Sequence, residues 1–217
     1  MNSTFNLEDD IKKTQEKYPL LTYHPPDFLE GTIELLADGM KLHDFQLEMK
    51  LPEIFPNCYP VVTETGGDIE RIEDRHVYTN SPHLCLGVKA EEIILCRFGQ
   101  GLKWFLDKIL VPRLAEEYLV MNGEGYMSEY SHGMEGPWEY YQKRFATEDR
   151  KLIVKLFKIT LSNALPKGYE LCPCGSQRKF SKCHRRYIYA IQSEIMQTNR
   201  FFWEEELRTL QSLVKSK

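Results

Sequence analysis

The sequence lacks any long apolar run, and this absence argues against a protein that spans a membrane. No stretch approaches the ~20 consecutive apolar residues that a helix needs to cross a bilayer. The first residues also lack the basic region and following apolar segment of a secretory signal. Internal repeats and low-complexity segments are missing too. We therefore expect a globular, cytoplasmic protein without a membrane partner.

A disulfide framework is not expected either, although the chain has six cysteines. Three of them, Cys172, Cys174 and Cys183, fall within twelve residues, while the others are scattered. In a reducing compartment, such a cluster is more often a metal site than a set of disulfides. Of the scattered cysteines, Cys58 lies beside prolines and Cys96 lies in an apolar run. Both are expected to be structural.

The two parts of the chain differ in the sign of their net charge. From Lys167 to the end there are ten Lys or Arg and five Glu, a balance of +5. Because the whole chain carries −4, the preceding 166 residues carry −9. The split favours two units with different partners, a domain over 1–145 and a helical region over 146–217. A solvated basic helix face would produce the same imbalance.

The apolar patterns predict a mixed α+β first domain. Asn6 can cap a first helix, because its side chain can accept hydrogen bonds from free N–H groups there. Asp38-Gly39 readily takes positive φ and therefore predicts a hairpin turn. From 42 to 51, polar and apolar residues alternate, as in a strand with one buried face. The expected elements are a helix over 7–18, strands over 28–36, 42–51 and 61–65, and a helix over 101–111. Pro112 either ends or kinks this last helix, or starts a second helix that runs to about residue 121.

The rest of the chain is expected to be mostly helical. Thr147 can cap a helix from 148 to about 164, and another helix should begin at Arg185. Before these helices, the glycine-rich segment 122–137 permits tight turns. It is either a flexible connector or a loop that folds over the site containing Cys85 and delivers His132.

Cys85 is the candidate nucleophile of the first domain. It lies two residues after His83 and nine after His76. A thiol reacts as its thiolate and an ordinary cysteine titrates near pH ~8.5, so a neighbouring imidazole is a common means of activation. The alternative is that Leu84-Cys85-Leu86 is a buried apolar triplet in which the cysteine acts as a small hydrophobic residue.

The order of these elements and motifs resembles the ubiquitin-conjugating enzyme (UBC-like) fold, over about residues 5–120. The most specific parts are Phe55-Pro56, Tyr59-Pro60, His76 and Leu84-Cys85-Leu86-Gly87. The resemblance implies an antiparallel meander with flanking helices. It also implies that Cys85 receives a ubiquitin-like protein from an activating enzyme, as a thioester, and passes it to an amine of a protein acceptor.

One position departs from the family. After His76 the family has Pro-Asn, whereas this chain has Val77-Tyr78. The family's asparagine stabilises the oxyanion of the aminolysis step. Asn80 or His83 would take this role here, unless the chemistry differs. His83 or His76 would position the reacting groups or remove a proton.

The cluster near the end of the chain has the composition of a structural zinc site. Cys172, Cys174, Cys183 and His184 supply three thiolates and one imidazole, which fill a tetrahedral zinc shell. The run closely resembles the SEC-C motif, the small zinc-binding element of the protein translocation ATPase and many bacterial proteins, over about 169–187. Gln177 stands where the motif commonly has glycine. This resemblance implies a bacterial protein with a small helical zinc-binding element after its α+β domain.

Two other functions are compatible with the sequence. In one, the first domain is a UBC-like scaffold that binds ubiquitin-like proteins without chemistry, as the missing asparagine allows. In the other, the basic zinc tail is an adaptor for nucleic acid or an acidic protein partner. Nucleic acid is the less favoured partner, because the basic residues are few and no aromatic residues alternate with them.

Overall fold

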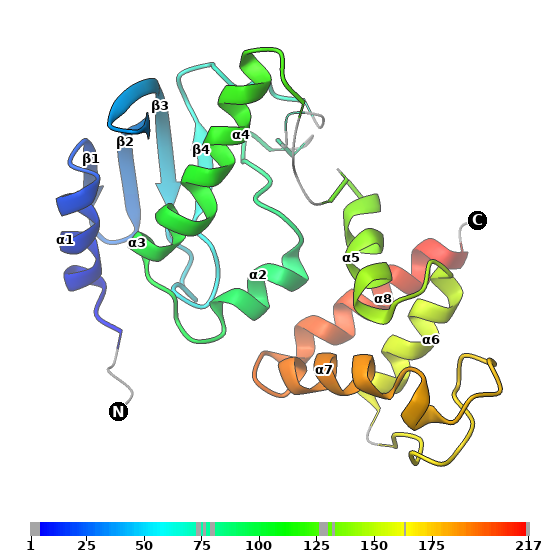
Figure 1. Ribbon diagram of the computed structural model, residues 1–217. Coiled ribbons are helices and arrows are strands. Elements are labelled where there is room, and N and C mark those ends of the chain that lie inside the picture. Colours follow the sequence, from blue (N-terminus) through cyan, green and yellow to red (C-terminus); the bar gives the residue numbers. More distant parts are fainter. Residues whose placement is uncertain are drawn as a thin grey trace. The chain divides into compact units, whose positions relative to one another are not determined.

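The computed structural model describes residues 5–72, 75, 77–78, 81–125, 130–131, 133–162 and 164–215, and the chain divides into two compact units, 1–133 and 134–217 (Figure 1). The division falls before the boundary expected at 145/146. Residues 135–145 are helical and pack on helices of the second unit. No helix in the described ranges is long and apolar enough to cross a bilayer.

The first unit contains a four-stranded antiparallel sheet in the order β1-β2-β3-β4. The hairpin turn between β2 and β3 is confirmed, with positive φ of 50° at Asp38 and 78° at Gly39. The first strand was not predicted, because it has only four residues and lies between prolines. The strands are β1 (Leu21–His24), β2 (Phe28–Ala37), β3 (Met40–Lys50) and β4 (Val61–Glu64).

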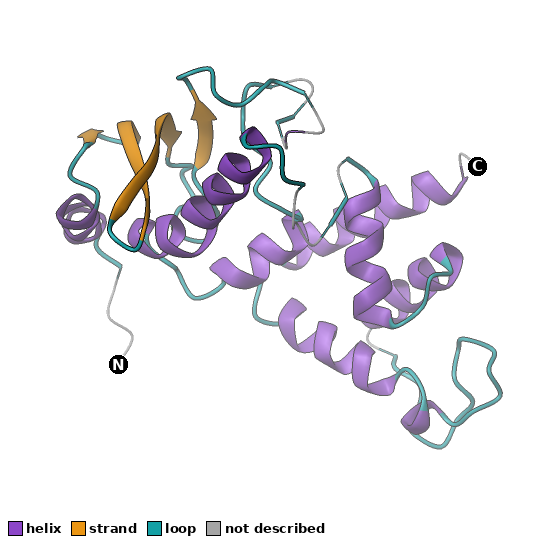
Figure 2. Ribbon diagram, turned by 45° about the horizontal axis from the view of Figure 1, so that its top comes forward, coloured by secondary structure: helices purple, strands orange, loops and turns teal. Residues whose placement is uncertain are grey.

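One face of the sheet is buried under helices, as the alternation of β3 predicts. Phe45, Leu47 and Met49 are almost fully buried, while Gln46 and Glu48 between them are exposed. Helix α4 (Val111–Met121) packs against β2 and crosses this face (Figure 2). The mixed α+β architecture with an antiparallel sheet and flanking helices is therefore confirmed.

The first helix of this unit begins at a capping side chain, and the later helices follow one another closely along the chain. α1 (Leu7–Lys17) starts at Asn6, whose side chain accepts a hydrogen bond from the Asp9 N–H, as predicted. After α2 (Lys89–Cys96), α3 (Leu102–Phe105) leads through a π-helical turn, η2 (Leu106–Leu110), into α4. Pro112, which has no N–H to donate, lies two residues after the end of this turn.

The second unit is helical and has an aromatic core. Its elements are α5 (Glu135–Phe145), α6 (Arg150–Leu161), the short η3 (Phe180–Lys182), α7 (Arg185–Ile195) and α8 (Arg200–Lys215). The rings of Tyr141 and Phe157 lie 5.0 Å apart, and Phe157 makes an edge contact with Trp203. All three side chains are fully buried.

The predicted cap of α6 is wrong. Asp149 begins the helix, and its carboxylate accepts hydrogen bonds from the N–H groups of Lys151 and Leu152. Thr147 instead accepts a hydrogen bond from the Asp149 N–H. An aspartate at this position also benefits from the positive end of the helix dipole.

Candidate functional site

The segment that carries Cys85 runs beside the last strand of the sheet. Bridges join Thr63 to His83 and Val77 to Leu84. Val77 and Leu84 are buried in the core. Because side chains alternate along extended backbone, the neighbours Tyr78, His83 and Cys85 are directed away from this core.

The imidazole of His83 is held by the sheet. Its Nδ1 lies 3.0 Å from the hydroxyl oxygen of Thr63 on β4. The contact fixes one ring nitrogen of His83, while a role in activating Cys85 stays a prediction. The other predicted residues of this site, His76 and Asn80, lie outside the described residues, as does His132 of the glycine-rich segment.

Burial distinguishes the three cysteines of this unit. Cys58 and Cys96 are almost completely buried, and burial raises their pKa to about 11 and about 12. Cys85 is partly exposed. Its Sγ lies 3.9 Å from the carbonyl oxygen of Gly87, at the limit of a weak hydrogen bond.

The side chain of Tyr78 is exposed, on the same side of the paired segments as Cys85. Partial burial of the phenol is the main cause that raises the pKa of Tyr78 well above its ordinary value, and the neighbouring Cys85 is the second cause. Tyr78 therefore stays protonated at neutral pH.

Cys85 opens onto a groove of about 220 Å³ with a charged lining that includes Glu91, Lys108, Arg113 and Glu116. Arg113 lies on α4 and donates a hydrogen bond of 2.8 Å to Glu116.

A buried ion network ties the groove to the segment that precedes Cys85. Glu117 is 1% exposed and pairs with both Arg113 and Arg75, the latter at 3.0 Å. The helical spacing of Arg113, Glu116 and Glu117 could have predicted pairs within the helix. The link to Arg75 could not be predicted, because it joins distant parts of the chain.

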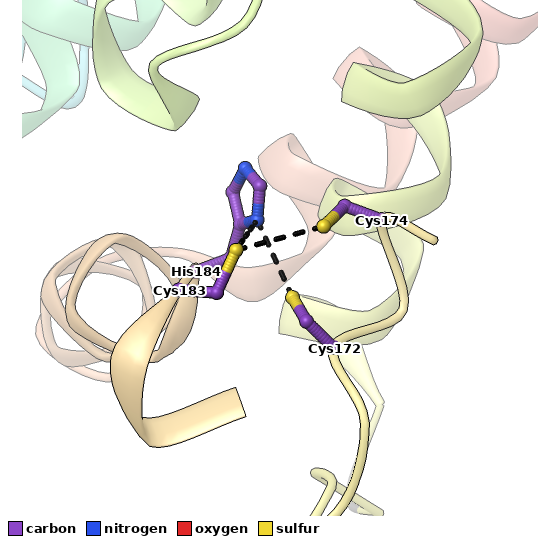
Figure 3. A group of neighbouring side chains, drawn as sticks. All are labelled: Cys172, Cys174, Cys183 and His184. Carbon is purple, nitrogen blue, oxygen red and sulfur yellow. Dashed lines mark hydrogen bonds between the residues drawn. The ribbon is translucent and has the colours of Figure 1, made fainter. Parts of the chain in front are cut away.

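The predicted metal ligands are brought together in the second unit. Cys172 and Cys174 lie on a tight loop closed by a 2.8 Å hydrogen bond from the Cys172 N–H to the Arg178 carbonyl. Cys183 and His184 lie at the start of α7. All four side chains point to a common centre (Figure 3).

The spacing of the ligand atoms fits a tetrahedral metal ion. Each residue of the cluster offers one ligand atom, a sulfur from each cysteine and a ring nitrogen from the histidine. These atoms all lie within 4.8 Å of one another, and they belong to Cys172, Cys174, Cys183 and His184. Cys174 Sγ is 3.6 Å from Cys183 Sγ, and His184 Nδ1 is 3.4 Å and 3.2 Å from the sulfurs of Cys172 and Cys183. Ligands of tetrahedral zinc lie about 3.8 Å apart for two sulfurs and about 3.6 Å for sulfur and nitrogen. The cluster can therefore hold a metal ion.

Residues 170–186 match the SEC-C motif. No curated protein and no solved structure matches the chain. The match confirms the predicted motif at the C-terminal cluster and covers only this short part of the sequence.

The backbone of the SEC-C motif explains one of its sequence features. Gln177 has a φ of 58°, and Gly175 has a φ of 81°. Glycine takes this left-handed conformation without steric cost, whereas other residues are strained in it. Position 177 is thus one where a glycine would fit better than the glutamine of this chain.

Polar groups surround the sulfurs of the SEC-C motif. Arg178 donates to Cys183 Sγ at 3.3 Å, a contact that the sequence did not reveal among the other basic residues nearby. Ser176 Oγ lies 3.1 Å from Cys174 Sγ. Burial acts to raise the pKa of Cys174, but the hydroxyl and backbone N–H of Ser176 and the adjacent thiols outweigh it and lower the pKa to about 6. For Cys172, burial dominates and raises the pKa to about 11.

Proposed function

We propose that residues 5–120 adopt the UBC-like fold and that Cys85 carries a ubiquitin-like protein as a thioester. The order of elements supports this fold: a first helix, a four-stranded antiparallel meander, the cysteine segment, and then the helices that cover the sheet. Among the described motifs of the resemblance, Phe55-Pro56 and Tyr59-Pro60 lie between β3 and β4, and Leu84-Cys85-Leu86-Gly87 lies between β4 and α2.

The exposure of Cys85 is the observation that carries the proposal. Cys58 and Cys96 are enclosed in the core, whereas Cys85 reaches a groove with a charged lining. A carrier thiol must meet two protein partners in turn, the activating enzyme and the acceptor, so it must be accessible. A thiol that served only as packing would have no such requirement.

The proposed chemistry consists of two acyl transfers. The Cys85 thiolate attacks the thioester of the charged activating enzyme, and the enzyme's thiolate leaves. The amine of the acceptor protein then attacks the acyl carbon on Cys85, forming an amide and releasing the Cys85 thiol. His83 and His76 are the candidates for positioning or deprotonating the attacking groups, and Asn80 is a candidate for stabilising the oxyanion.

The test combines this protein with a ubiquitin-like protein, its activating enzyme and nucleotide. We expect an adduct on a non-reducing gel that a thiol reductant removes. Cys85→Ser should form a slower, reductant-resistant oxyester, because the hydroxyl is a much weaker nucleophile. An adduct that persists in Cys85→Ala would exclude Cys85. Tight binding without any adduct would support the non-catalytic scaffold instead.

We also propose that the SEC-C ligands hold structural zinc. Three sulfurs and one imidazole make a closed four-ligand set with no position left for a substrate, as in structural rather than catalytic zinc sites. Elemental analysis of protein purified without chelator should find one zinc per chain. Protein that is folded but contains no stoichiometric metal would contradict this assignment.

A basic groove beside the SEC-C ligands favours a second candidate function, an adaptor for an acidic protein. The groove has a volume of about 420 Å³, and its lining includes Arg178, Lys182 and Arg186. Fluorescence anisotropy with an acidic peptide would test this function. Binding should weaken at least ~10-fold in Lys182→Glu/Arg186→Glu, since two attractive charges become repulsive. Unchanged binding in this variant would argue against the groove as the site.

A further inference from the structure

The guanidinium of Arg178 lies at the edge of the SEC-C ligand cluster. It donates a hydrogen bond to Cys183 Sγ at 3.3 Å, and both residues line the basic groove beside the ligands. Over residues 170–186, all of which the structure describes, no other basic side chain contacts a ligand sulfur. Arg178 is thus distinguished from the basic residues around it by a direct contact with the cluster.

The backbone of the ligand loop holds Arg178 in this position. Its carbonyl oxygen accepts a 2.8 Å hydrogen bond from the Cys172 N–H, and its own N–H donates to Ser176 Oγ at 3.5 Å. On either side of these contacts, Leu171 and Lys179 pair in an isolated bridge. The fold that gathers the ligands therefore also places the guanidinium, because one of its anchors is the ligand Cys172 itself.

We propose that Arg178 determines how firmly the SEC-C cluster retains zinc, and that it shields the sulfur of Cys183 from electrophiles. This inference rests on the proposed structural zinc and adds a positioning residue to it. Arg178 offers no ligand to the metal and acts through the Cys183 sulfur, to which it donates.

The net charge of a loaded site explains the expected effect on zinc affinity. Three thiolates carry three negative charges, and a divalent ion with a neutral imidazole adds two positive charges, so the loaded site keeps one negative charge. An arginine side chain is a permanent cation, and hydrogen bonds to charged acceptors are stronger than neutral ones. Groups that hydrogen-bond to metal ligands typically change metal affinity by roughly 10- to 100-fold. The cation of Arg178 should therefore favour the loaded site.

The same hydrogen bond bears on the reactivity of the Cys183 sulfur. A thiolate attacks electrophiles through its lone pairs, and a donated hydrogen bond makes these less available. The other two sulfurs have different surroundings, because Cys172 is buried and Cys174 contacts the neutral hydroxyl of Ser176 at 3.1 Å. That hydroxyl also lies 3.5 Å from Cys183 Sγ, so it is shared by two sulfurs. Removal of the Arg178 guanidinium should therefore expose Cys183 more than the other two.

Zinc affinity of the full-length protein is the first measurement. The zinc-loaded protein is titrated with a chelating dye, and transfer of zinc to the dye is followed by absorbance. Arg178→Gln should weaken zinc binding by roughly 10-fold or more. Lys179→Gln is the matched control, because it removes a charge from the next residue without removing a contact to a sulfur, and its affinity should stay within about 2-fold of wild type. Equal affinities of wild type and Arg178→Gln, or equal losses in both variants, would overturn the role of Arg178.

Labelling of the ligand sulfurs separates loss of this one contact from general loosening of the loop. The zinc-loaded proteins are treated with N-ethylmaleimide at neutral pH and mapped by mass spectrometry. In Arg178→Gln, the labelling rate of Cys183 relative to Cys172 and Cys174 should rise at least ~3-fold over wild type, because only Cys183 loses a hydrogen bond. Equal acceleration at all three sulfurs would contradict the specific contact. Wild-type protein that holds no stoichiometric zinc would instead contradict the assignment of structural zinc itself.

Discussion

At the residue scale, burial makes the cysteines of the first unit chemically unequal. The thiols of Cys58 and Cys96 have pKa values raised to about 11 and about 12, and both are shielded by the core. We expect iodoacetamide at neutral pH to label Cys85 at least ~10-fold faster than either, since access and thiolate content both limit the reaction. Peptide mapping by mass spectrometry measures the three rates. Equal labelling in the folded protein would contradict the account of this site.

Asp107 provides a pH-dependent contribution to stability. Burial acts to raise its pKa, but hydrogen bonds from Lys103, Lys17 and Tyr18 outweigh it and hold the pKa well below the ordinary value of 3.8. A carboxyl whose pKa is lower in the folded state than in the unfolded state stabilises the protein at pH values above its unfolded-state pKa. This stabilisation is lost as the pH falls toward and through its folded-state pKa.

Asp107→Asn should therefore lower the free energy of unfolding at pH ~7 by about 1–2 kcal/mol, allowing for the exposure of the lysines. Urea unfolding at several pH values measures this difference. The gap between wild type and variant should narrow as the pH falls below about 4, where the unfolded carboxyl takes up its proton. A gap that is independent of pH would contradict the argument.

At the element scale, the pairing of β1 with β2 depends on Gly31. This residue has a φ of 140°, and a Cβ at its position would lie 2.1 Å from the Leu20 carbonyl oxygen. Gly39, in the hairpin turn, also has positive φ, but a Cβ there would meet nothing within 4 Å.

Gly31→Ala should cost at least ~2–3 kcal/mol of unfolding free energy, because backbone strain and a backbone clash act together. Gly39→Ala is the matched control and should cost only about 1 kcal/mol, from conformation alone. Urea denaturation of the two variants measures both values. Similar losses of unfolding free energy in the two variants would show that the nearby Leu20 carbonyl does not exclude a side chain at position 31.

The sequence predicted the elements whose signals are local. The alternation in β3 and the Asp38-Gly39 turn identify the hairpin, since both depend on neighbouring residues. Helix α5 was missed because Gly136 and Pro137 indicate a loop. Proline is nevertheless tolerated in a first helical turn, where its missing N–H has no intrahelical partner, and α5 is anchored by the buried side chains of Trp138 and Tyr141.

The same distinction applies to the candidate sites. The spacing of the three cysteines and His184 predicts the metal cluster, because all four ligands belong to one short segment. The contact of Arg178 with the Cys183 sulfur depends on how the backbone turns. It does not follow from spacing along the chain.

At the scale of the whole molecule, the two units should respond separately to loss of metal. The SEC-C ligands converge only if their mutual repulsion is offset, so Cys174→Ser or a chelator should unfold their loop and loosen α7. Hydrogen exchange followed by mass spectrometry should show at least ~10-fold faster exchange in α7 and unchanged protection in β2 and β3. Loss of protection in both units would contradict their independence, and no change in either would contradict a structural metal.

The central claim is that Cys85 is an acyl carrier, and the position of the acyl group tests it most directly. The protein is exposed to a peptide that ends in Gly-Gly and is activated as a mercaptoethanesulfonate thioester. It is then digested without reductant and mapped by tandem mass spectrometry. We predict that the acyl group is found on Cys85, that it is removed by neutral hydroxylamine, and that Cys58 and Cys96 remain unmodified. An acyl group on another cysteine, or none on Cys85 while iodoacetamide still reaches it, would contradict the account.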